Sequence, residues 1–271
     1  LPYATLFQTD DRIESPGPKP PSATPAEPHS GLLAAETWVF DLDNTLYPAR
    51  CNLFDQVDRR MGAFIADALG LTHEEARVVQ KQYFREYGTT LSGLMERHGV
   101  DPHDFLHFVH DIDYSPIERD ARLSGALERL EARKVIFTNG TVSHAEAVVE
   151  RLGVGHHFEA IFDIAAADFV PKPRPAPYRA LVERHAIDPT RAVMVEDIAK
   201  NLETPAEMGM RTVWVRTDHA WSHPGVKDDG AEPEAYIHHV TDDLGRFLHA
   251  LFEAQAAEDG ESRGAAAPEA G

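Results

Sequence analysis

The sequence predicts an α/β protein with a parallel sheet, helices on both faces of that sheet and one all-helical insertion. From residue 121 onward, short apolar runs rich in β-branched residues alternate with helical patterns. Such alternation is typical of a parallel sheet covered by helices. Between the first apolar run and residue 121 lies a stretch with helical periodicity and no strand signal. We therefore expect the insertion to follow the first strand directly.

The first expected strand is the run Thr-Trp-Val-Phe at residues 37–40, and two carboxylates one residue apart follow it. Asp41 and Asp43 would lie at the carboxyl edge of the sheet, where open α/β sheets bind ligands. Positions i and i+2 of a strand share a face, so we expect the two acids to converge on one small volume. Two negative charges at such a short distance repel each other, so the arrangement usually needs a cation or a task in which one acid is protonated. The alternative, a surface Asp-x-Asp turn, is disfavoured by the apolar run before it and the Asn-Thr after it.

The helical insertion is expected from residue 51 to residue 120. Its first helix is indicated by apolar residues at helical spacing: Phe54, Val57, Met61, Phe64, Ile65 and Ala68. Thr72 and Glu75 form a capping box that opens a second helix, which reaches about Tyr87. Further helical patterns cover residues 91–98 and 102–110. The apolar stripes of this block are more consistent with helix packing than with a substrate slot.

The core is expected at residues 36–50 and 121–254. Helices and strands should alternate there over residues 121–132, 134–138, 143–152, 160–163, 177–185, 192–195, 201–208 and 211–215. Residues 10–30 are rich in Pro, Ser, Asp and Glu with few large apolar groups, and residues 255–271 are rich in Ala, Glu and Gly. We therefore expect disordered tails at residues 1–35 and 255–271.

Three later segments place polar side chains where expected strands end. Thr138 and Asn139 follow one strand, and Glu196 and Asp197 end another, with Asn201 shortly beyond. The third segment contains a lysine. Carboxylates, a hydroxyl and an ammonium group at one edge of a sheet suit Mg²⁺ and phosphate.

The ammonium would come from Lys172, which lies in the segment Pro-Lys-Pro-Arg-Pro. Prolines hold such a segment extended, so the lysine could point inward as a fixed charge. Taken alone, it is more consistent with an exposed linker lysine.

Four short motifs together resemble the signatures of the haloacid dehalogenase-like hydrolases. They are Asp41-x-Asp43-x-Thr45, Thr138, Lys172 and the pair Glu196-Asp197, in the order of that family, and the resemblance covers residues 36–250. It implies a Rossmann-like core, with the helical insertion as a cap above the site. The runs Phe-Asp-Leu-Asp-Asn-Thr-Leu-Tyr-Pro and Phe-Thr-Asn-Gly are most similar to the bacterial and yeast pyrimidine 5′-nucleotidase branch.

The resemblance implies catalytic roles for the two first acids. Asp41 would attack phosphorus and form an aspartyl-phosphate. Asp43 would protonate the leaving alkoxide and then deprotonate the attacking water. Dehalogenases of this fold eject halide, which needs no proton, and they lack an acid at the position of Asp43. The presence of this acid therefore favours phosphate esters.

The resemblance also implies a Mg²⁺ site and a phosphate site. The Asp41 carboxylate, the Asp43 main-chain carbonyl and Asp197 would hold the metal ion, with Glu196 acting through a bound water. Thr138 and the Asn139 main chain would donate hydrogen bonds to the phosphate, and Lys172 would balance the charge of the nucleophile and the transferring group. Asn201 would support that lysine or the acids.

The expected partner is a small phosphorylated metabolite. The expected function is hydrolysis of a nucleoside monophosphate, UMP or CMP first, to a nucleoside and phosphate. Phosphoglycolate or a sugar phosphate is the alternative substrate. A catalytically idle homologue that binds a phosphometabolite or a partner protein is the alternative of another class. The acids and the lysine are all present, which favours an active enzyme.

Composition favours a cytoplasmic enzyme. The single cysteine, Cys51, excludes an intramolecular disulfide and is typical of a reducing compartment. A net charge of −19 disfavours nucleic-acid polymers, whose phosphates would be repelled. We expect no membrane span, because no apolar run reaches the necessary length, and no secretory signal.

Other polar and aromatic residues have ordinary interpretations. The fifteen histidines include the adjacent pairs at 156–157 and 238–239, and we interpret them as solvated or core residues because no ligand partner stands at metal-site spacing. The side chains that could face a substrate are Tyr47, Arg50, Tyr83, Phe84 and Tyr87. Core packing is equally consistent with the last three.

Overall fold

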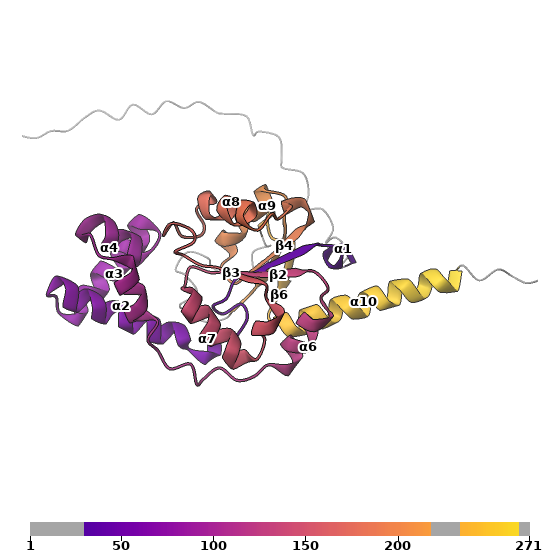
Figure 1. Ribbon diagram of the computed structural model, residues 1–271, viewed down its shortest axis with the longest axis horizontal. Helices are drawn as coiled ribbons and strands as arrows, with labels where there is room; N and C mark the ends of the chain where they lie inside the picture. The colour runs from indigo at the N-terminus through magenta and orange to yellow at the C-terminus, as the bar shows by residue number, and fades with distance from the viewer. Residues whose placement is uncertain (1–29, 218–233, 266–271) are drawn as a thin grey trace, which may run out of the picture.

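A parallel sheet of six strands forms the centre of the protein, in the order β3-β2-β1-β4-β5-β6 (Figure 1). The computed structural model describes residues 30–217 and 234–265. The strands are β1 (Thr37–Phe40), β2 (Arg133–Phe137), β3 (Ala160–Phe162), β4 (Ala192–Glu196), β5 (Arg211–Val215) and β6 (His239–Thr241). β1 lies between β2 and β4, with Phe40 paired to Ile136 and to Val195. The predicted α/β class with a parallel sheet is confirmed.

Helices cover both faces of the sheet because its strands are apolar on both sides. Trp38 and Phe40 pack into one hydrophobic cluster, while Val39 between them packs into another, as the period of a strand requires. The first face is covered by α1 (Ser30–Leu33), α6 (Ala121–Arg129), α7 (Val142–Leu152) and α10 (Leu244–Ala265). The second is covered by α8 (Pro175–Arg184), the 3-10 helix η4 (Ala199–Leu202) and α9 (Glu203–Glu207) (Figure 1).

The strand order creates a switch point between β1 and β4. From β1 the chain moves to β2 and β3 on one side, and then returns to β4, β5 and β6 on the other. Open α/β sheets bind ligands outside the carboxyl ends of the strands at such a point. The loops that follow Phe40 and Glu196 therefore lie side by side at the expected ligand position.

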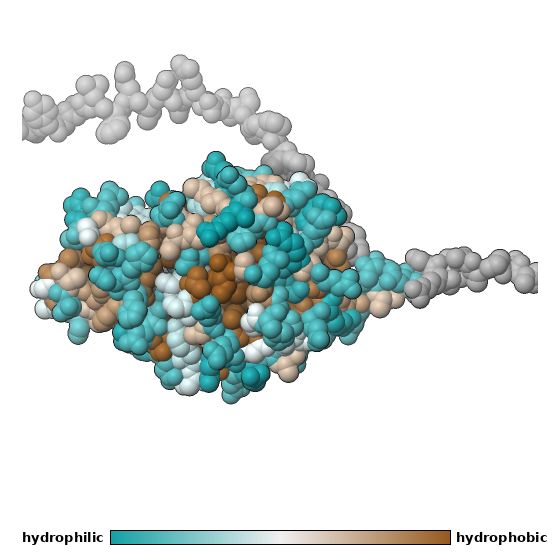
Figure 2. All heavy atoms as spheres, viewed as in Figure 1, coloured by the Kyte–Doolittle hydropathy of each residue, from teal (hydrophilic) through white to brown (hydrophobic). Residues whose placement is uncertain are grey.

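Four inserted helices lie to the left of the sheet in Figure 1 and pack around a further hydrophobic cluster, which Ile164 of the loop after β3 joins. The capping box is confirmed, because Thr72 Oγ1 accepts from the Glu75 N–H while Glu75 Oε2 accepts from the Thr72 N–H. Hydrophobic residues also gather in the middle of the visible face, beside this insertion (Figure 2). The helices are α2 (Leu53–Leu69), α3 (His73–Tyr87), α4 (Thr90–His98) and α5 (Pro102–Val109).

The structure differs from the expected boundaries of both tails, residues 1–35 and 255–271. Leu32 in α1 is 1% exposed and packs in the core, so the expectation of disorder is wrong for residues 30–35. Helix α10 continues to Ala265, so it is wrong for residues 255–265 as well. Alanine and glutamate are strong helix formers, which allows α10 to continue beyond its packed residues Leu248 and Leu251. Residues 1–29 and 266–271 lie outside the described residues, and the division into core and insertion stays a prediction.

The expected list of elements ended at residue 215, so it missed β6, a strand of three residues next to a part of the chain that is not described, and the helix α10. Within residues 30–217 and 234–265, no helix combines the length and the apolar character needed to cross a membrane.

Candidate active site

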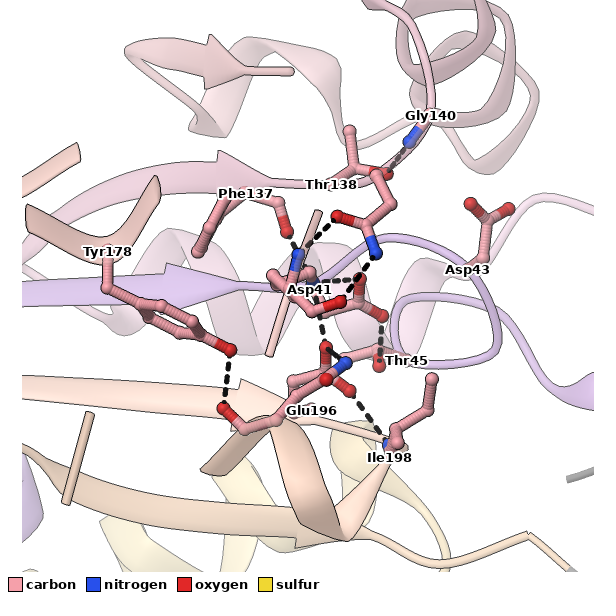
Figure 3. Close-up of polar contacts among 12 residues, drawn as sticks. Asp41, Asp43, Thr45, Phe137, Thr138, Gly140, Tyr178, Glu196 and Ile198 are labelled. Atoms are coloured by element: carbon pink, nitrogen blue, oxygen red, sulfur yellow. Dashed lines mark hydrogen bonds and ion pairs between the residues drawn. The ribbon is translucent and has the colours of Figure 1, made fainter. Parts of the chain in front are cut away.

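The carboxylate of Asp41 lies at the centre of the site, directly after the last residue of β1. The Asp41 N–H donates to the Val195 carbonyl at 2.9 Å, which continues the pairing with β4 beyond the strand. Oδ1 of Asp41 accepts from Lys172 Nζ and Oδ2 accepts from Thr45 Oγ1, both at 2.7 Å (Figure 3). Donors from two different segments therefore fix both oxygens of this acid.

Lys172 is buried and fully hydrogen-bonded, so its interpretation as an exposed linker lysine is wrong. Its Nζ donates to Asp41 and Glu196 at 2.7 Å and to the Phe137 carbonyl at 2.9 Å. These three acceptors match the three hydrogens of an ammonium group. Burial by itself lowers the pKa of Lys172, but the two carboxylates outweigh it and raise the pKa above its usual value. The side chain is therefore a fixed positive charge.

Glu196 ends β4 and is completely buried. Its Oε1 accepts from Lys172 and from Asn201 Nδ2, both at 2.7 Å, and its Oε2 accepts from the Ile198 N–H at 2.7 Å. Protein donors thus hold both oxygens of a residue that we expected to act through water. Asn201 lies beside the acids, and its supporting role stays a prediction.

Asp41, Glu196 and Asp197 form a buried acidic cluster in which one oxygen of each lies within 4.8 Å of the others. Burial, and then the charge of Glu196, raise the pKa of Asp41 to about 7 and that of Asp197 well above its usual value. Lys172 supplies one positive charge against these three acids. Carboxylate oxygens so close together suit a hard divalent cation, which removes their repulsion. The residues present therefore fit a metal ion such as Mg²⁺.

Asp43 does not share the partners of Asp41, although the two acids are one residue apart. Its Oδ1 accepts from Tyr47 Oη at 2.6 Å and lies 2.8 Å from His144 Nε2. In Figure 3 its carboxylate lies apart from the cluster around Asp41 and Glu196. The argument from strand alternation was wrong, because β1 ends at Phe40 and both acids belong to the following loop.

The surroundings of Asp43 favour its ionised form. Burial opposes ionisation, but His144 and the Tyr47 hydroxyl outweigh it and lower the pKa of Asp43 to about 2. The two acids of the first motif therefore have pKa values moved in opposite directions, which is typical of acids with different tasks.

The residues after β2 connect two loops of the site. Thr138 is 1% exposed, and its Oγ1 accepts from the Gly140 N–H at 2.9 Å. The side-chain oxygen of Asn139 accepts from the Lys172 N–H at 2.9 Å. Asn139 thus holds the segment that carries the lysine, a role that the sequence did not reveal.

The sequence interpretation missed His144, which is 2% exposed and contacts Asp43. A signal was available, since His144 begins the buried stripe of α7, which continues with Ala145, Val148, Val149 and Leu152. A histidine on the inward face of a helix that starts after a site motif is a candidate for contact with the site.

The five residues considered for substrate contact differ in their surroundings. Tyr47 is buried against Asp43, and Arg50 is exposed. Tyr83 packs within the insertion, because its Oη lies 2.6 Å from His98 Nε2 and its ring stands edge-on to Tyr87. Phe84 is 37% exposed, which leaves part of its ring open to a ligand.

Comparison with known proteins identifies similar sequences. The profile of the haloacid dehalogenase-like hydrolases matches residues 36–209. Phosphate metabolism protein 8 of Saccharomyces cerevisiae is 27% identical over 195 residues, which cover 65% of this chain and 60% of that protein. The chain therefore spans less than two thirds of the length of this relative.

Solved structures share the fold. CbbY from Rhodobacter sphaeroides, in complex with phosphate, has a TM-score of 0.52 at 19% identity, over 78% of this chain and 95% of CbbY. YfnB from Bacillus subtilis, a putative HAD-hydrolase bound to magnesium, has a TM-score of 0.51 at 16% identity, over 80% and 98%. At these identities the likeness concerns the fold, in which α2–α5 correspond to a cap.

Proposed function

Since this chain belongs to the haloacid dehalogenase-like hydrolase family and is therefore a hydrolase, we propose that it is a Mg²⁺-dependent phosphomonoesterase. The observation that carries the proposal is the different environment of the two acids in the first motif. Asp41 lies in a buried cluster with Lys172, and Asp43 is held apart by Tyr47 and His144. Two carboxylates in different environments suit a nucleophile and a separate acid and base.

Asp41 is the proposed nucleophile. An oxygen of its carboxylate attacks phosphorus, the bond from phosphorus to the ester oxygen breaks, and an aspartyl-phosphate forms. Lys172 and Thr45 hold the two carboxylate oxygens, so the acid is oriented before substrate binds. Water then cleaves the aspartyl-phosphate and releases inorganic phosphate.

Asp43 is the proposed acid and base. It gives a proton to the leaving alkoxide and later takes one from the attacking water. Its ionised form suits the second step directly. For the first step, a phosphate dianion next to Asp43 would raise its pKa by repulsion of like charges. Halide needs no proton on departure, so this second acid favours phosphate esters over haloacids.

The metal ion would be held by the carboxylates of Asp41 and Asp197 and by the main-chain carbonyl of Asp43, with Glu196 beside them. When bound, Mg²⁺ supplies positive charge to the acidic cluster and to the phosphoryl oxygens.

The phosphate group would be bound by the residues that follow β2 together with Lys172. The Thr138 hydroxyl and the Asn139 N–H are the proposed hydrogen-bond donors to its oxygens. The Lys172 ammonium balances the negative charge of the transferring group.

A nucleoside monophosphate, UMP or CMP first, is the proposed substrate. The likeness of the first two motifs to pyrimidine 5′-nucleotidases supports this choice, and so does an insertion that can contact the part of the substrate beyond the phosphate. A sugar phosphate is the second candidate, because a CbbY variant of similar fold, with a TM-score of 0.52, was solved with xylulose-(1,5)bisphosphate. An idle binding homologue is disfavoured by the presence of both acids and the lysine.

A phosphate-release screen tests the proposal. The parent protein is assayed with UMP, CMP, AMP, GMP, phosphoglycolate, sugar phosphates and 2-chloropropionate, each with Mg²⁺ and with EDTA. We expect Mg²⁺-dependent phosphate release and no chloride release. The absence of phosphate release from every ester would support the idle homologue, and chloride release would support a dehalogenase.

A further inference from the structure

His144 connects the acid Asp43 with the exit segment, which is the part of the chain that leaves the helical insertion after α5 and contains His110 and Tyr114. Its Nε2 lies 2.8 Å from Asp43 Oδ1, and its Nδ1 lies 3.0 Å from Tyr114 Oη. The ring of His110 stacks on the ring of His144, with centroids 4.4 Å apart and an interplanar angle of 17°. His110 is the C-cap of α5, the last helix of the insertion. The exit from the insertion therefore packs directly on the imidazole that contacts Asp43.

The imidazole has little freedom to move. His144 lies in the first turn of α7, where its N–H donates to the N-cap Thr141 at 3.2 Å, and its side chain is 1% exposed. Tyr114 Oη donates its one hydrogen to the His110 carbonyl at 2.9 Å and also lies 3.0 Å from His144 Nδ1, so the phenol contacts both the ring and the exit segment. The main chain of His144 is thus fixed at the start of α7, and its buried ring packs against the exit segment.

The two partners of Asp43 are not equivalent. Tyr47 is four residues further along the same loop, and its ring packs in the main hydrophobic cluster. His144 is 101 residues away in the sequence and belongs to a core helix. His144 therefore joins the Asp43 carboxylate to α7 and to the exit segment.

We propose that His144 is a positioning residue that sets the direction of the Asp43 carboxylate, and that His110 and Tyr114 fix the imidazole that does so. Both contacts to Asp43 end on Oδ1, which leaves Oδ2 to exchange the proton with the leaving group. The consequence for catalysis rests on the proposed function, whereas the consequence for the direction of the carboxylate does not.

The kinetic test compares two esters in variants of His144. UMP has an alkoxide leaving group, which needs a proton in order to depart. The leaving group of 4-nitrophenyl phosphate is a nitrophenolate, which departs with little protonation. We expect His144→Ala to lower kcat for UMP at least about tenfold more than kcat for the aryl ester, with KM little changed. His144→Gln keeps a donor of similar reach and should recover part of the loss, and Tyr114→Phe should give a smaller loss of the same kind.

Two controls separate positioning from general damage. His157→Gln changes a half-buried histidine that contacts Ser124, and it should leave both rates unchanged. In an Asp43→Asn background, His144→Ala should add less than about a twofold loss, because the group on which it acts is already absent. Equal losses on the two esters, or an undiminished loss in the Asp43→Asn background, would overturn the proposal.

A structural arm decides the proposal without any activity. Crystal structures of the parent, His144→Gln and His144→Ala are compared at Asp43. We expect the carboxylate to keep its direction in the Gln variant and to turn in the Ala variant, and an unchanged direction in His144→Ala would overturn the proposal. Should His144→Ala not fold, Tyr114→Phe takes its place in both arms: kcat should fall more for UMP than for the aryl ester and the Asp43 carboxylate should turn, and equal losses or an unchanged direction would overturn the proposal. A parent that releases no phosphate from any ester would refute the proposed function and leave this arm intact.

Discussion

Oδ1 of Asp41 lies 2.7 Å from Nζ of Lys172, and both side chains are almost completely buried. The contact joins the end of β1 to a segment 131 residues later. It places a fixed positive charge against the carboxylate that we propose as nucleophile, and it leaves that carboxylate in one orientation.

The first prediction concerns this carboxylate. Asp41→Asn keeps the shape of the side chain but cannot attack phosphorus, so phosphate release should fall by at least about three orders of magnitude. Thermal unfolding should show an intact fold. Glu203→Gln is a matched control, because Glu203 pairs with Lys200 at the surface and its loss should leave the rate unchanged. Turnover of Asp41→Asn within about tenfold of the parent would contradict the covalent mechanism.

The second prediction separates Asp43 from the nucleophile. Asp43→Asn should slow UMP hydrolysis about a hundredfold or more, and should slow 4-nitrophenyl phosphate hydrolysis far less. The reason is that a nitrophenolate leaves without a proton, whereas an alkoxide does not. The ratio of kcat for the two esters is the measurement. If both esters lose the same factor, Asp43 has a task other than proton transfer.

The third prediction concerns metal binding without turnover. Mg²⁺ should raise the Tm of the EDTA-treated protein in a concentration-dependent way, because it removes repulsion within the buried acidic cluster. Asp197→Asn should remove most of this shift, and Glu203→Gln should preserve it. Differential scanning fluorimetry across a magnesium titration measures both. A parent whose Tm does not respond to Mg²⁺ would speak against the metal site.

The fourth prediction concerns selectivity and is independent of the chemistry. UMP and CMP should exceed AMP and GMP in kcat/KM, if the insertion contacts the base. Phe84→Ala should narrow that preference and leave 4-nitrophenyl phosphate hydrolysis unchanged, since part of the Phe84 ring is exposed. Comparable rates on purine nucleotides, or a clear lead for phosphoglycolate or a sugar phosphate, would favour the second candidate substrate.

The fifth prediction concerns the stability of the insertion and its dependence on pH. Hydrogen bonds from Thr72 lower the pKa of Glu75 below its ordinary value of 4.5. This contribution to stability is therefore present above pH 4.5 and is lost as the pH falls through the lower, folded-state pKa. Thr72→Ala should lower Tm by about 2–4 °C at neutral pH and by less in acid. An equal Tm difference at both pH values would contradict the role of the box.

The sequence by itself determined the features that depend on neighbouring residues. Strand and helix periods, the capping box of Thr72 and Glu75, and the order of the motifs are local, so most helices and strands of the core and the insertion could be predicted. Asp41, Glu196 and Asp197, which were expected at strand ends, also lie together, because parallel strands bring their carboxyl ends to one edge. Their catalytic roles stay predictions.

Only the tertiary structure decided the contacts between segments far apart in the chain. The proline-rich segment around Lys172 gives no local sign that its ammonium is buried against Asp41 and Glu196. In the same way, the crossover from β2 through α7 brings His144 to Asp43, which gives that acid other partners than those of Asp41. Burial and partner choice at such distances depend on how helices pack on the sheet, which local periodicity does not specify.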